Sequence, residues 1–538
     1  MIVAEAVGTA LAQAGVDRVF GVVGSGNFHL TNALVAAGAA FTAARHEGGA
    51  ATMADAYGRM SGRTGVVTVH QGPGLTNALT GLTEAAKSRT PLLLIAAQAT
   101  VPGSNFWVDQ AAIATAVGAL PIRLSTPTTA VSEALRALRT ATRDRRTIVL
   151  NVPLDVGHAA WPGETVAPPE PAPHHPAVDG SPLAQALGCA QRPVFIAGRG
   201  ARHAAHPLVR LAERSGALLA TSAVAKGLFP GEPFSLDVSG GFASPLAVEL
   251  ISGADLIVGW GCALNMWTMR HGTLINPEAV VAQVDIEPEA IGRERKTDIG
   301  IIGDCAEVAS SILDAITERP GYRSEALRER IAAEGRWRDV AYADDSTADR
   351  IDARTLSIAV DDLLPQQRIV AVDSGNFMGY PSMYLSVPDE NGFCFTQAYQ
   401  SIGLGLSTAI GAALARPDRL PVAACGDGGF LMGIADLDTA VRLRLPLVVV
   451  VYNDEAYGAE VHHFGPDGFA LDTVRFPETD LAAIGRGFGC DAITVRRPAD
   501  LRGLSDWLAG ERTRPLVVDA KVTQARGSWW LEEAFRGH

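Results

Sequence analysis

Short apolar runs alternate with helix-length amphipathic stretches along this chain of 538 residues. The clearest runs cover residues 92–97 and 445–452, which are rich in Leu, Val and Ile and have the length of a buried strand. Ala- and Leu-rich stretches separate runs of this kind. Because strands that are buried on both faces read as continuous apolar runs, the pattern predicts an α/β fold of mostly parallel sheets flanked by helices.

Two interruptions divide this pattern into three blocks. Residues 161–182 are dense in proline and lack apolar periodicity, which predicts an extended linker. A second, charged stretch at about 322–352 is expected to be helical and to precede the next strand. A chain of this length exceeds a single hydrophobic core. We therefore predict three domains, over residues 1–160, 183–320 and 350–538, each a mostly parallel sheet flanked by helices.

The composition of the chain limits the kinds of partner and the cellular compartment that we expect. The chain has 45 Lys and Arg against 58 Asp and Glu, a net charge of −13, and contains no basic block. This charge argues against binding to nucleic acid or to an anionic membrane. The apolar runs are strand-sized, and no basic segment of a secretory signal stands at the start. Six scattered cysteines without a Cys-x-x-Cys pair are typical of free thiols in a reducing compartment, so we expect a cytoplasmic protein.

A segment of the first block is echoed in the third. Gly72 opens a Gly-Pro-Gly turn, and an Arg-Thr-Pro sequence ending at Pro91 precedes the apolar run at 92–97. Gly426 opens a Gly-Asp-Gly turn, and an Arg-Leu-Pro sequence ending at Pro446 precedes the apolar residues 447–452. The glycine-to-proline separations are 19 and 20 residues. The echo predicts that the outer domains are homologous sheets that could face each other, although such successions also recur by chance in α/β proteins.

Two carboxylates in the third block form a candidate cofactor site. Asp427 and Asp454 stand 27 residues apart, and each follows an apolar run. Parallel strands that are neighbours would bring both to the carboxyl edge of one sheet, where ligands bind. The glycines beside Asp427 would allow backbone to approach a phosphate, and carboxylates suit Mg²⁺. The segment predicts a cradle for a diphosphate and a magnesium ion, although an Asp-Gly pair alone is also an ordinary turn.

Together these segments resemble the signature of the thiamine-diphosphate-dependent superfamily of acetolactate synthase, pyruvate decarboxylase and benzoylformate decarboxylase. That signature usually ends in Asn-Asn, whereas this chain has Asn453-Asp454. The resemblance implies that thiamine diphosphate and Mg²⁺ are cofactors, with Asp427, Asp454 and the carbonyl of Ala456 as metal ligands, or Asn453 if the loop is shifted by one residue. The implied cofactor-binding residues of this region are Gly426, Asp427, Gly428, Gly429, Asp454, Ala456, Tyr457 and Gly458.

The first block resembles the pyrimidine-binding domain of the same family. Residues 45–50 read Arg-His-Glu-Gly-Gly-Ala, and residues 71–77 read Gln-Gly-Pro-Gly-Leu-Thr-Asn. The resemblance places the glutamate of the family at Glu47, where a carboxylate bonded to the aminopyrimidine promotes the deprotonation that makes the cofactor a nucleophile. It also implies that Gly72 and Asn77 bind the cofactor. On composition alone, Glu47 would be a helix N-terminal carboxylate favoured by the helix dipole.

Two further segments extend the resemblance over nearly the whole chain. Residues 395–406 are similar to a segment of the family that contacts the cofactor. In that segment an apolar side chain wedges the cofactor into its bent shape, and a backbone carbonyl accepts a hydrogen bond from the amino group of the cofactor. The resemblance assigns the first role to Ile402 and the second to the backbone of Gln400. Residues 254–262 and 283–288 resemble the central domain, which holds FAD in acetolactate synthases and pyruvate oxidases. The charged run of those synthases is replaced here by residues 265–271, so FAD is not expected.

The residues that would meet the substrate are Ser25, His70, Gln110 and Glu460. The resemblance places Ser25 at a substrate-binding serine, His70 and Glu460 at proton-transferring positions of decarboxylases, and Gln110 at a polar position that faces substrate in several carboligases. A histidine titrates close to neutral pH and is therefore suited to proton transfer. The alternatives are a loop serine, a capped histidine and solvated charges.

The resemblance implies an enzyme that decarboxylates a 2-oxo acid and then protonates the resulting enamine or joins it to an aldehyde or keto acceptor. Homodimers or homotetramers with active sites between subunits are implied, with Glu47 of one chain facing the Asp427 domain of another. Three alternatives stay open: a lyase acting on 2-hydroxyacyl or 1,2-dione substrates, a flavin-containing synthase or oxidase of the same family, and an inactive binding paralogue. Sequence alone names neither the substrate nor the acceptor.

Overall fold

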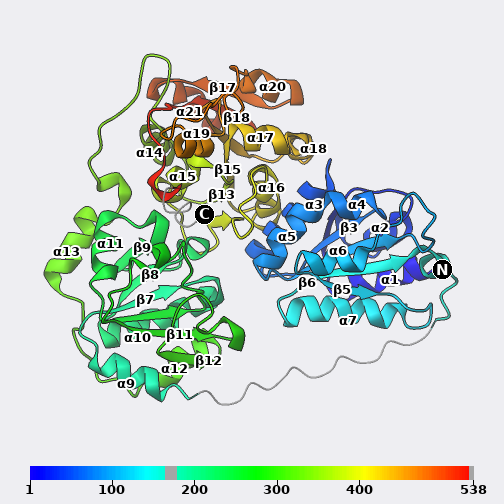
Figure 1. Cartoon of the computed structure of the whole chain (residues 1–538). Helices are drawn as coiled ribbons and strands as arrows, with labels where there is room; N and C mark the ends of the chain where they lie inside the picture. Colours follow the sequence, from blue (N-terminus) through cyan, green and yellow to red (C-terminus); the bar gives the residue numbers. More distant parts are fainter. Residues whose placement is uncertain (164–178, 532–538) are drawn as a thin grey trace.

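The chain forms three sheets, each of six parallel strands and each flanked by helices (Figure 1), which confirms the predicted α/β class. The computed structural model describes residues 1–163 and 179–531. None of the helices in these two ranges combines the length and apolarity needed to cross a bilayer.

The first sheet has the strand order β2-β1-β3-β4-β6-β5. Its strands are β1 (Arg18–Gly21), β2 (Ala40–Ala43), β3 (Gly65–Val69), β4 (Leu92–Gln98), β5 (Leu120–Arg123) and β6 (Thr147–Pro153). Its helices are α1 (Val3–Gln13), α2 (Phe28–Ala36), α3 (Glu47–Ser61), α4 (Pro73–Asn77), α5 (Leu79–Lys87), α6 (Gln110–Ala116), α7 (Ala130–Arg143) and α8 (Leu154–His158). The apolar run predicted as a strand forms β4, whose residues are almost entirely buried.

The central sheet has the order β12-β11-β10-β7-β8-β9. Its strands are β7 (Pro193–Ala197), β8 (Leu218–Thr221), β9 (Ser235–Val238), β10 (Leu256–Trp260), β11 (Val280–Asp285) and β12 (Ile299–Ile302). The α-helices around it are α9 (Ser181–Cys189), α10 (Ala205–Ser215), α11 (Pro245–Ser252), α12 (Cys305–Leu313) and α13 (Glu325–Glu334), and a short 3-10 helix, η1 (Arg199–Ala204), follows β7.

The third sheet has the order β14-β13-β15-β16-β18-β17. Its strands are β13 (Arg368–Val372), β14 (Phe393–Phe395), β15 (Leu420–Gly426), β16 (Val448–Asn453), β17 (Asp491–Val495) and β18 (Leu516–Lys521). Its α-helices are α14 (Ala353–Leu363), α15 (Gly379–Tyr384), α16 (Gly405–Ala415), α17 (Asp427–Gly433), α18 (Leu437–Arg442), α19 (Gly458–Phe464), α20 (Leu481–Phe488) and α21 (Arg502–Ala509). The first and third sheets therefore share one strand order, as the echo between the outer blocks suggests.

Both predicted domain boundaries differ in detail from the structure. Most of the predicted linker at 161–182 lies outside the described residues, but Ser181 already begins α9, with Pro182 in its first turn. Proline is tolerated there because the first backbone N–H groups of a helix need no intrahelical partner. In the second boundary, the described helices are α13 and a short 3-10 turn at Trp337–Asp339, so the stretch is helical only in part.

The outer two domains share a hydrophobic core. Helices α3 and α16 pack against each other between the two sheets, as Figure 1 shows, and one cluster of buried side chains runs from Leu94 in β4 to Val449 in β16. The approach is close because the facing residues are small: a Cβ added at Gly411 would lie 2.1 Å from the carbonyl oxygen of Met53. The first domain, which carries one half of the predicted active site, is thus packed firmly against the third domain of the same chain.

Candidate active site

A cavity of about 440 Å³ lies at the carboxyl edge of the third sheet, beyond β13, β15 and β16. Apart from Asn453, the alternative metal ligand, every residue of the third block that the sequence singled out contributes to its wall. These residues are Gln400, Ile402, Gly426, Asp427, Gly428, Gly429, Asp454, Ala456, Tyr457, Gly458 and Glu460. The remainder of the wall is largely apolar and includes Phe377, Met378 and Trp267.

Asp427 and Asp454 lie side by side in this cavity. Asp427 is the first residue of α17, directly after β15, and Asp454 follows the last residue of β16. These strands are neighbours, with Gly426 opposite Tyr452. Burial raises the pKa of Asp427 to about 6, and burial together with the charge of Asp427 raises the pKa of Asp454 well above its usual range. Two carboxylates in this arrangement need a shared proton or a cation to lie together stably.

The structure distinguishes Asp454 from its neighbour Asn453. The Asn453 side chain is buried, donates to a carboxylate oxygen of Asp519 at 2.8 Å and accepts from the backbone N–H of Glu455 at 3.2 Å. Asn453 therefore belongs to the framework beneath the loop, whereas Asp454 lines the cavity.

Glycines keep the loops around the two carboxylates close together. A Cβ added at Gly458 would lie 2.3 Å from Oδ2 of Asp454, and one added at Gly428 would lie 2.6 Å from the ring of Tyr457. Larger residues at these two positions would displace Asp454 or Tyr457.

Asp373, which was not among the predicted site residues, supports the segment that carries Ile402. It is fully buried at the end of β13, and its carboxylate accepts from the backbone N–H groups of Ser374, Gly403 and Leu404 at 2.8 to 3.2 Å. Burial raises the pKa of this carboxyl to about 6, against the lowering effect of those hydrogen bonds. The position of Ile402 therefore depends on a side chain about thirty residues earlier in the sequence.

Gln400 stands on the same segment, with a left-handed backbone at φ 58°. The preceding residues are held from the first domain, because Glu84 accepts from the N–H groups of Ala398 and Tyr399 at 3.1 and 2.7 Å. Glu84 in turn binds Arg59, whose Nη1 donates to the carbonyl of Phe395 at 2.9 Å. This buried network ties the Gln400 segment to helices α3 and α5.

Glu84 is expected to stabilise the fold strongly. The side chains of Arg59, Asp55 and Glu84 are only 5%, 0% and 1% exposed, so the alanine variant Glu84→Ala leaves part of a buried guanidinium charge and two backbone N–H groups without partners. We expect the free energy of unfolding to fall by about 3–5 kcal/mol, measured by urea denaturation. The matched control is Glu325→Ala on the surface of α13, which should cost less than about 1 kcal/mol. Equal losses in the two variants would contradict this role for Glu84.

The residues predicted in the first block gather at the carboxyl edge of the first sheet. His70 follows β3, and its Nδ1 accepts from the backbone N–H of Gly26 at 3.2 Å, next to the exposed Ser25. The backbone N–H of Gly72, at φ 66°, donates to Oε1 of Gln110 at 3.4 Å. Gln110 is buried and also donates to Asn151 at 2.7 Å, so it acts as part of the framework in this chain.

Glu47 is the first residue of α3 and lies beside this group. Its Oε2 accepts from Nδ2 of Asn77 at 3.1 Å, and His46 caps the same helix by accepting from the N–H of Gly48. Burial lowers the pKa of His70, while the charge of Glu47 acts in the opposite direction. His70 is therefore neutral near pH 7, with its hydrogen on Nε2 because Nδ1 accepts.

The two halves of the predicted site do not meet within one chain. Among the described residues that line the 440 Å³ cavity, none belongs to the first domain, so Glu47 and His70 lie elsewhere. The carboxyl edges of the outer sheets thus offer two separate sets of functional groups, one carrying Asp427 and Asp454 and the other carrying Glu47.

Comparisons with known proteins agree with this arrangement of domains. The model of the thiamine pyrophosphate enzyme N-terminal TPP binding domain matches residues 1–117, that of the central domain matches 181–312, and that of the C-terminal TPP binding domain matches 373–520.

Curated relatives align over most of the chain. A probable 2-ketoarginine decarboxylase of Pseudomonas aeruginosa is 30% identical, with 91% of this chain and 88% of the relative covered. A sulfoacetaldehyde acetyltransferase of Rhodobacter capsulatus is 29% identical over 99% of this chain and 96% of its own length. The acetolactate synthase large subunit of Parasynechococcus marenigrum is 28% identical over 91% of this chain and 83% of its own length. With three matched domains and a relative at this level of identity, the chain belongs to the family of thiamine-diphosphate-dependent enzymes that break or form carbon–carbon bonds.

Proposed function

We propose that this enzyme uses thiamine diphosphate and Mg²⁺ to decarboxylate a 2-oxo acid, and that it protonates the carbon left behind or joins it to a carbonyl acceptor. The observation that carries the proposal is the pairing of Asp427 and Asp454 at a glycine-lined cavity on the sheet edge of the C-terminal domain. The family membership supplies the cofactor class.

The residues present fit the proposed metal. Two adjacent carboxylates, one buried and one half-buried, carry charge that a divalent cation would neutralise, and Ala456 lies on the same cavity wall. No group of three or more His, Cys, Asp or Glu side chains gathers as a metal site in residues 1–163 or 179–531, so diphosphate and water would complete the coordination. Mg²⁺ characteristically binds through one or two carboxylates together with phosphates.

Asp427, Asp454 and the carbonyl of Ala456 would hold the ion, and the backbone around Gly428 and Gly429 would approach the diphosphate. When bound, thiamine diphosphate supplies an electron sink for the bond that breaks next to a carbonyl group. Glu47 would share a proton with the pyrimidine ring, the carbonyl of Gln400 would accept a hydrogen from its amino group, and Ile402 would fix the bend of the cofactor. The protein contributes orientation and proton transfer.

We further propose that the active site lies between two copies of the chain. Glu47 sits on a carboxyl sheet edge that takes no part in the cavity of its own chain. The packing of α3 against α16 fixes this separation, because the two domains share a core. A second copy that presents its first domain to the cavity would complete the site.

The proposal is tested by incubating the purified protein with thiamine diphosphate and Mg²⁺ and offering pyruvate, benzoylformate and branched 2-oxo acids. Release of CO₂ is measured separately from formation of acyloin or acetohydroxy acid. CO₂ release that depends on both cofactors supports the proposal. Tight binding of thiamine diphosphate without turnover of any 2-oxo acid would favour the lyase on 2-hydroxyacyl or 1,2-dione substrates instead.

His70 and Glu460 are expected to direct the product towards an aldehyde. His70 is neutral and carries a hydrogen on Nε2, and Glu460 lines the cavity. If they protonate the carbon left by decarboxylation, His70→Ala and Glu460→Gln should raise the share of carboligation when an aldehyde acceptor is added. Each tenfold change in the product ratio corresponds to about 1.4 kcal/mol between the two barriers.

The product ratio is measured by chromatography at a saturating 2-oxo acid concentration. The exposed His206 of the central domain provides the control, because His206→Ala should leave the ratio unchanged. If the unmodified enzyme yields only acyloin or acetohydroxy acid, and neither site variant alters that ratio, the two residues are ordinary polar groups of the pocket. The carboligase function would then take precedence.

A further inference from the structure

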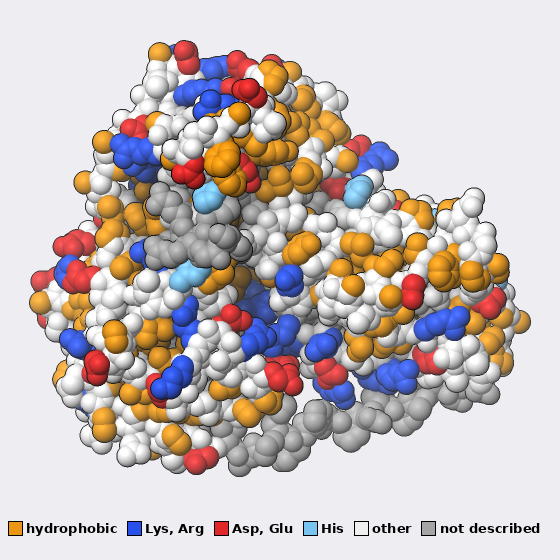
Figure 2. All heavy atoms as spheres, viewed as in Figure 1, with side chains coloured by type: hydrophobic (Ala, Val, Ile, Leu, Met, Phe, Trp, Pro, Cys, Tyr) orange, Lys and Arg blue, Asp and Glu red, His pale blue; other side chains and the backbone are white. Residues whose placement is uncertain are grey.

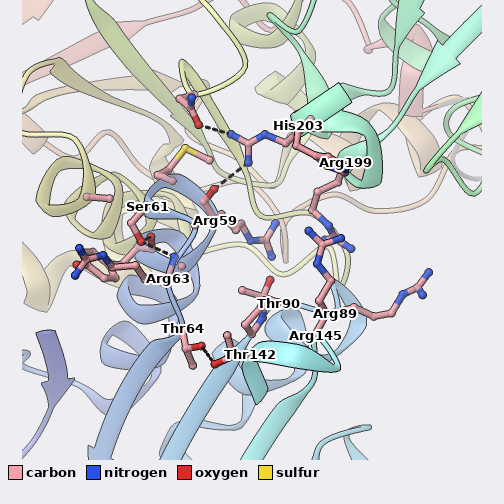
Figure 3. Close-up of a pocket in the computed structure, with 18 of the residues that line it drawn as sticks. Arg59, Ser61, Arg63, Thr64, Arg89, Thr90, Thr142, Arg145, Arg199 and His203 are labelled. Atoms are coloured by element: carbon pink, nitrogen blue, oxygen red, sulfur yellow. Dashed lines mark hydrogen bonds between the residues drawn. The ribbon is translucent and has the colours of Figure 1, made fainter. Parts of the chain in front are cut away.

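Arginine side chains gather in a cleft of about 1030 Å³ where the first, central and third domains meet (Figure 3). Arg63, Arg89 and Arg145 are among the residues that line it. Figure 2 shows Lys and Arg side chains around the hollow between the first and central domains, although the whole chain is acidic. Arg350 lines neither this cleft nor the 440 Å³ cavity, and its guanidinium instead reaches the loop that carries Asp454.

This loop follows β16 and has an unusual backbone beside a proposed metal ligand. Glu455 has φ of 56°, in the left-handed region, where a Cβ is disfavoured and glycine is the usual residue. Its sequence neighbours Asp454 and Ala456 both line the cavity, whereas Glu455 does not. A backbone conformation of this kind persists where the surrounding contacts hold it in place.

Backbone hydrogen bonds hold the loop from one side. The carbonyl of Glu455 accepts from the N–H of Phe476 at 2.8 Å. The N–H of Tyr457 donates to the carbonyl of Val474 at 2.8 Å, and Ala456 forms an antiparallel bridge with the same segment. Because Phe476 is 41% exposed, this pairing lies near the surface, and the side chain of Glu455 provides the contact with the interior.

Two cationic side chains hold the carboxylate of Glu455, which is only 14% exposed. Nη2 of Arg350 donates to Oε2 at 2.5 Å, and Nζ of Lys521 lies 3.9 Å from Oε1. Nη1 of Arg350 also donates to the carbonyl of Val522 at 3.1 Å. Lys521 is the last residue of β18 and is 1% exposed. Each oxygen of the carboxylate therefore faces its own cation.

The backbone of Arg350 is fixed to the end of the same strand. The N–H of Ile351 donates to the carbonyl of Lys521 at 2.9 Å, and the N–H of Thr523 donates to the carbonyl of Ile351 at 3.0 Å. This short parallel pairing continues the carboxyl end of β18, which is the neighbour of β16 in the sheet. Both cations that hold Glu455 thus belong to the rigid sheet.

We propose that Arg350 and Lys521 are positioning residues for the metal ion. They clamp Glu455 in its left-handed conformation and thereby fix Asp454 and Ala456 at the cavity wall. This role rests on the proposed function, in which Mg²⁺ binds beside Asp454. The sign of the effect separates it from a simple charge effect. Loss of a nearby positive charge would by itself strengthen Mg²⁺ binding, whereas loss of the clamp weakens it because the ligands are no longer held in place.

The clamp is tested by measuring thiamine diphosphate bound per chain after gel filtration over a range of Mg²⁺ concentrations. Arg350→Gln should raise the Mg²⁺ concentration for half-maximal retention about tenfold or more, as changes behind metal ligands commonly do. Retention at saturating Mg²⁺ should stay unchanged, whereas partial unfolding would lower it. Arg350→Lys keeps the charge and should restore most of the affinity. Arg63→Gln breaks an exposed ion pair with Asp17 and is the control, with no expected change.

A double-mutant cycle shows whether Arg350 acts through Glu455. Glu455→Gln should also raise the Mg²⁺ requirement, and the combined variant should be no worse than the weaker single variant, because both changes remove one contact. Glu455→Gln also serves as the test if Arg350→Gln does not fold. An unchanged or lowered Mg²⁺ requirement in these variants, or losses that multiply in the combined variant, would overturn the clamp alone. If the unmodified chain retains no thiamine diphosphate at any Mg²⁺ concentration, the proposed metal site is wrong and the clamp falls with it.

Discussion

The variant Glu47→Gln is expected to bind thiamine diphosphate normally but to exchange the C2 hydrogen of the bound cofactor about 10²–10⁴-fold more slowly. Glutamine has the shape of glutamate, and its amide oxygen can still accept from Nδ2 of Asn77 at the start of α3. What it loses is the ability to share a proton with the pyrimidine ring. The change therefore removes a positioned proton acceptor without removing a structural contact.

The exchange is measured by NMR after rapid mixing with D₂O, with cofactor retention measured in parallel. Glu334→Gln on the exposed face of α13 is the control and should alter neither quantity. Unchanged exchange in Glu47→Gln would remove Glu47 from the mechanism. Loss of cofactor in the same variant would instead assign Glu47 to binding.

The third domain is the part of the molecule that could best be predicted from its sequence. The apolar run before Asp454 forms the buried strand β16, and Asp427 follows its neighbour β15. Because parallel neighbours end at the same sheet edge, two local motifs suffice to place both carboxylates at one cavity. The identical strand orders of the first and third sheets likewise agree with the echo around Gly72 and Gly426.

Contacts between distant segments could not be predicted in this way. Glu84 lies 314 residues from Ala398, and nothing near Glu84 in the sequence indicates that it accepts from that backbone. Nothing in the sequence around Arg89 and Arg145 indicates their left-handed backbone or the cleft that both line, because these features exist only in the folded chain. The separation of Glu47 from Asp427 within one chain also depends on the α3–α16 packing, which local motifs do not specify.

Replacing Asp427 with alanine is expected to abolish Mg²⁺-dependent retention of thiamine diphosphate. Asp427 is buried beside Asp454; burial raises the pKa of both carboxyl groups, and the charge of Asp427 raises the pKa of Asp454 further. A divalent cation would supply that charge and link the pair to the diphosphate. Without Asp427 the ion loses a ligand on the wall nearest the backbone of Gly428. Retention is measured as cofactor bound per chain after gel filtration with and without Mg²⁺.

Asp454→Asn provides the contrasting change. The amide still offers an oxygen to the ion, but the repulsion between two adjacent carboxylates disappears, so we expect this variant to retain the cofactor as well as or better than the unmodified chain. Asp472→Ala, at an exposed position of the same domain, is the control and should behave like the unmodified chain. Full retention by Asp427→Ala after dialysis against a chelator would contradict a metal site here. Loss of the cofactor in Asp454→Asn would instead show that the charge of Asp454, and not only its oxygen, is required to hold the ion.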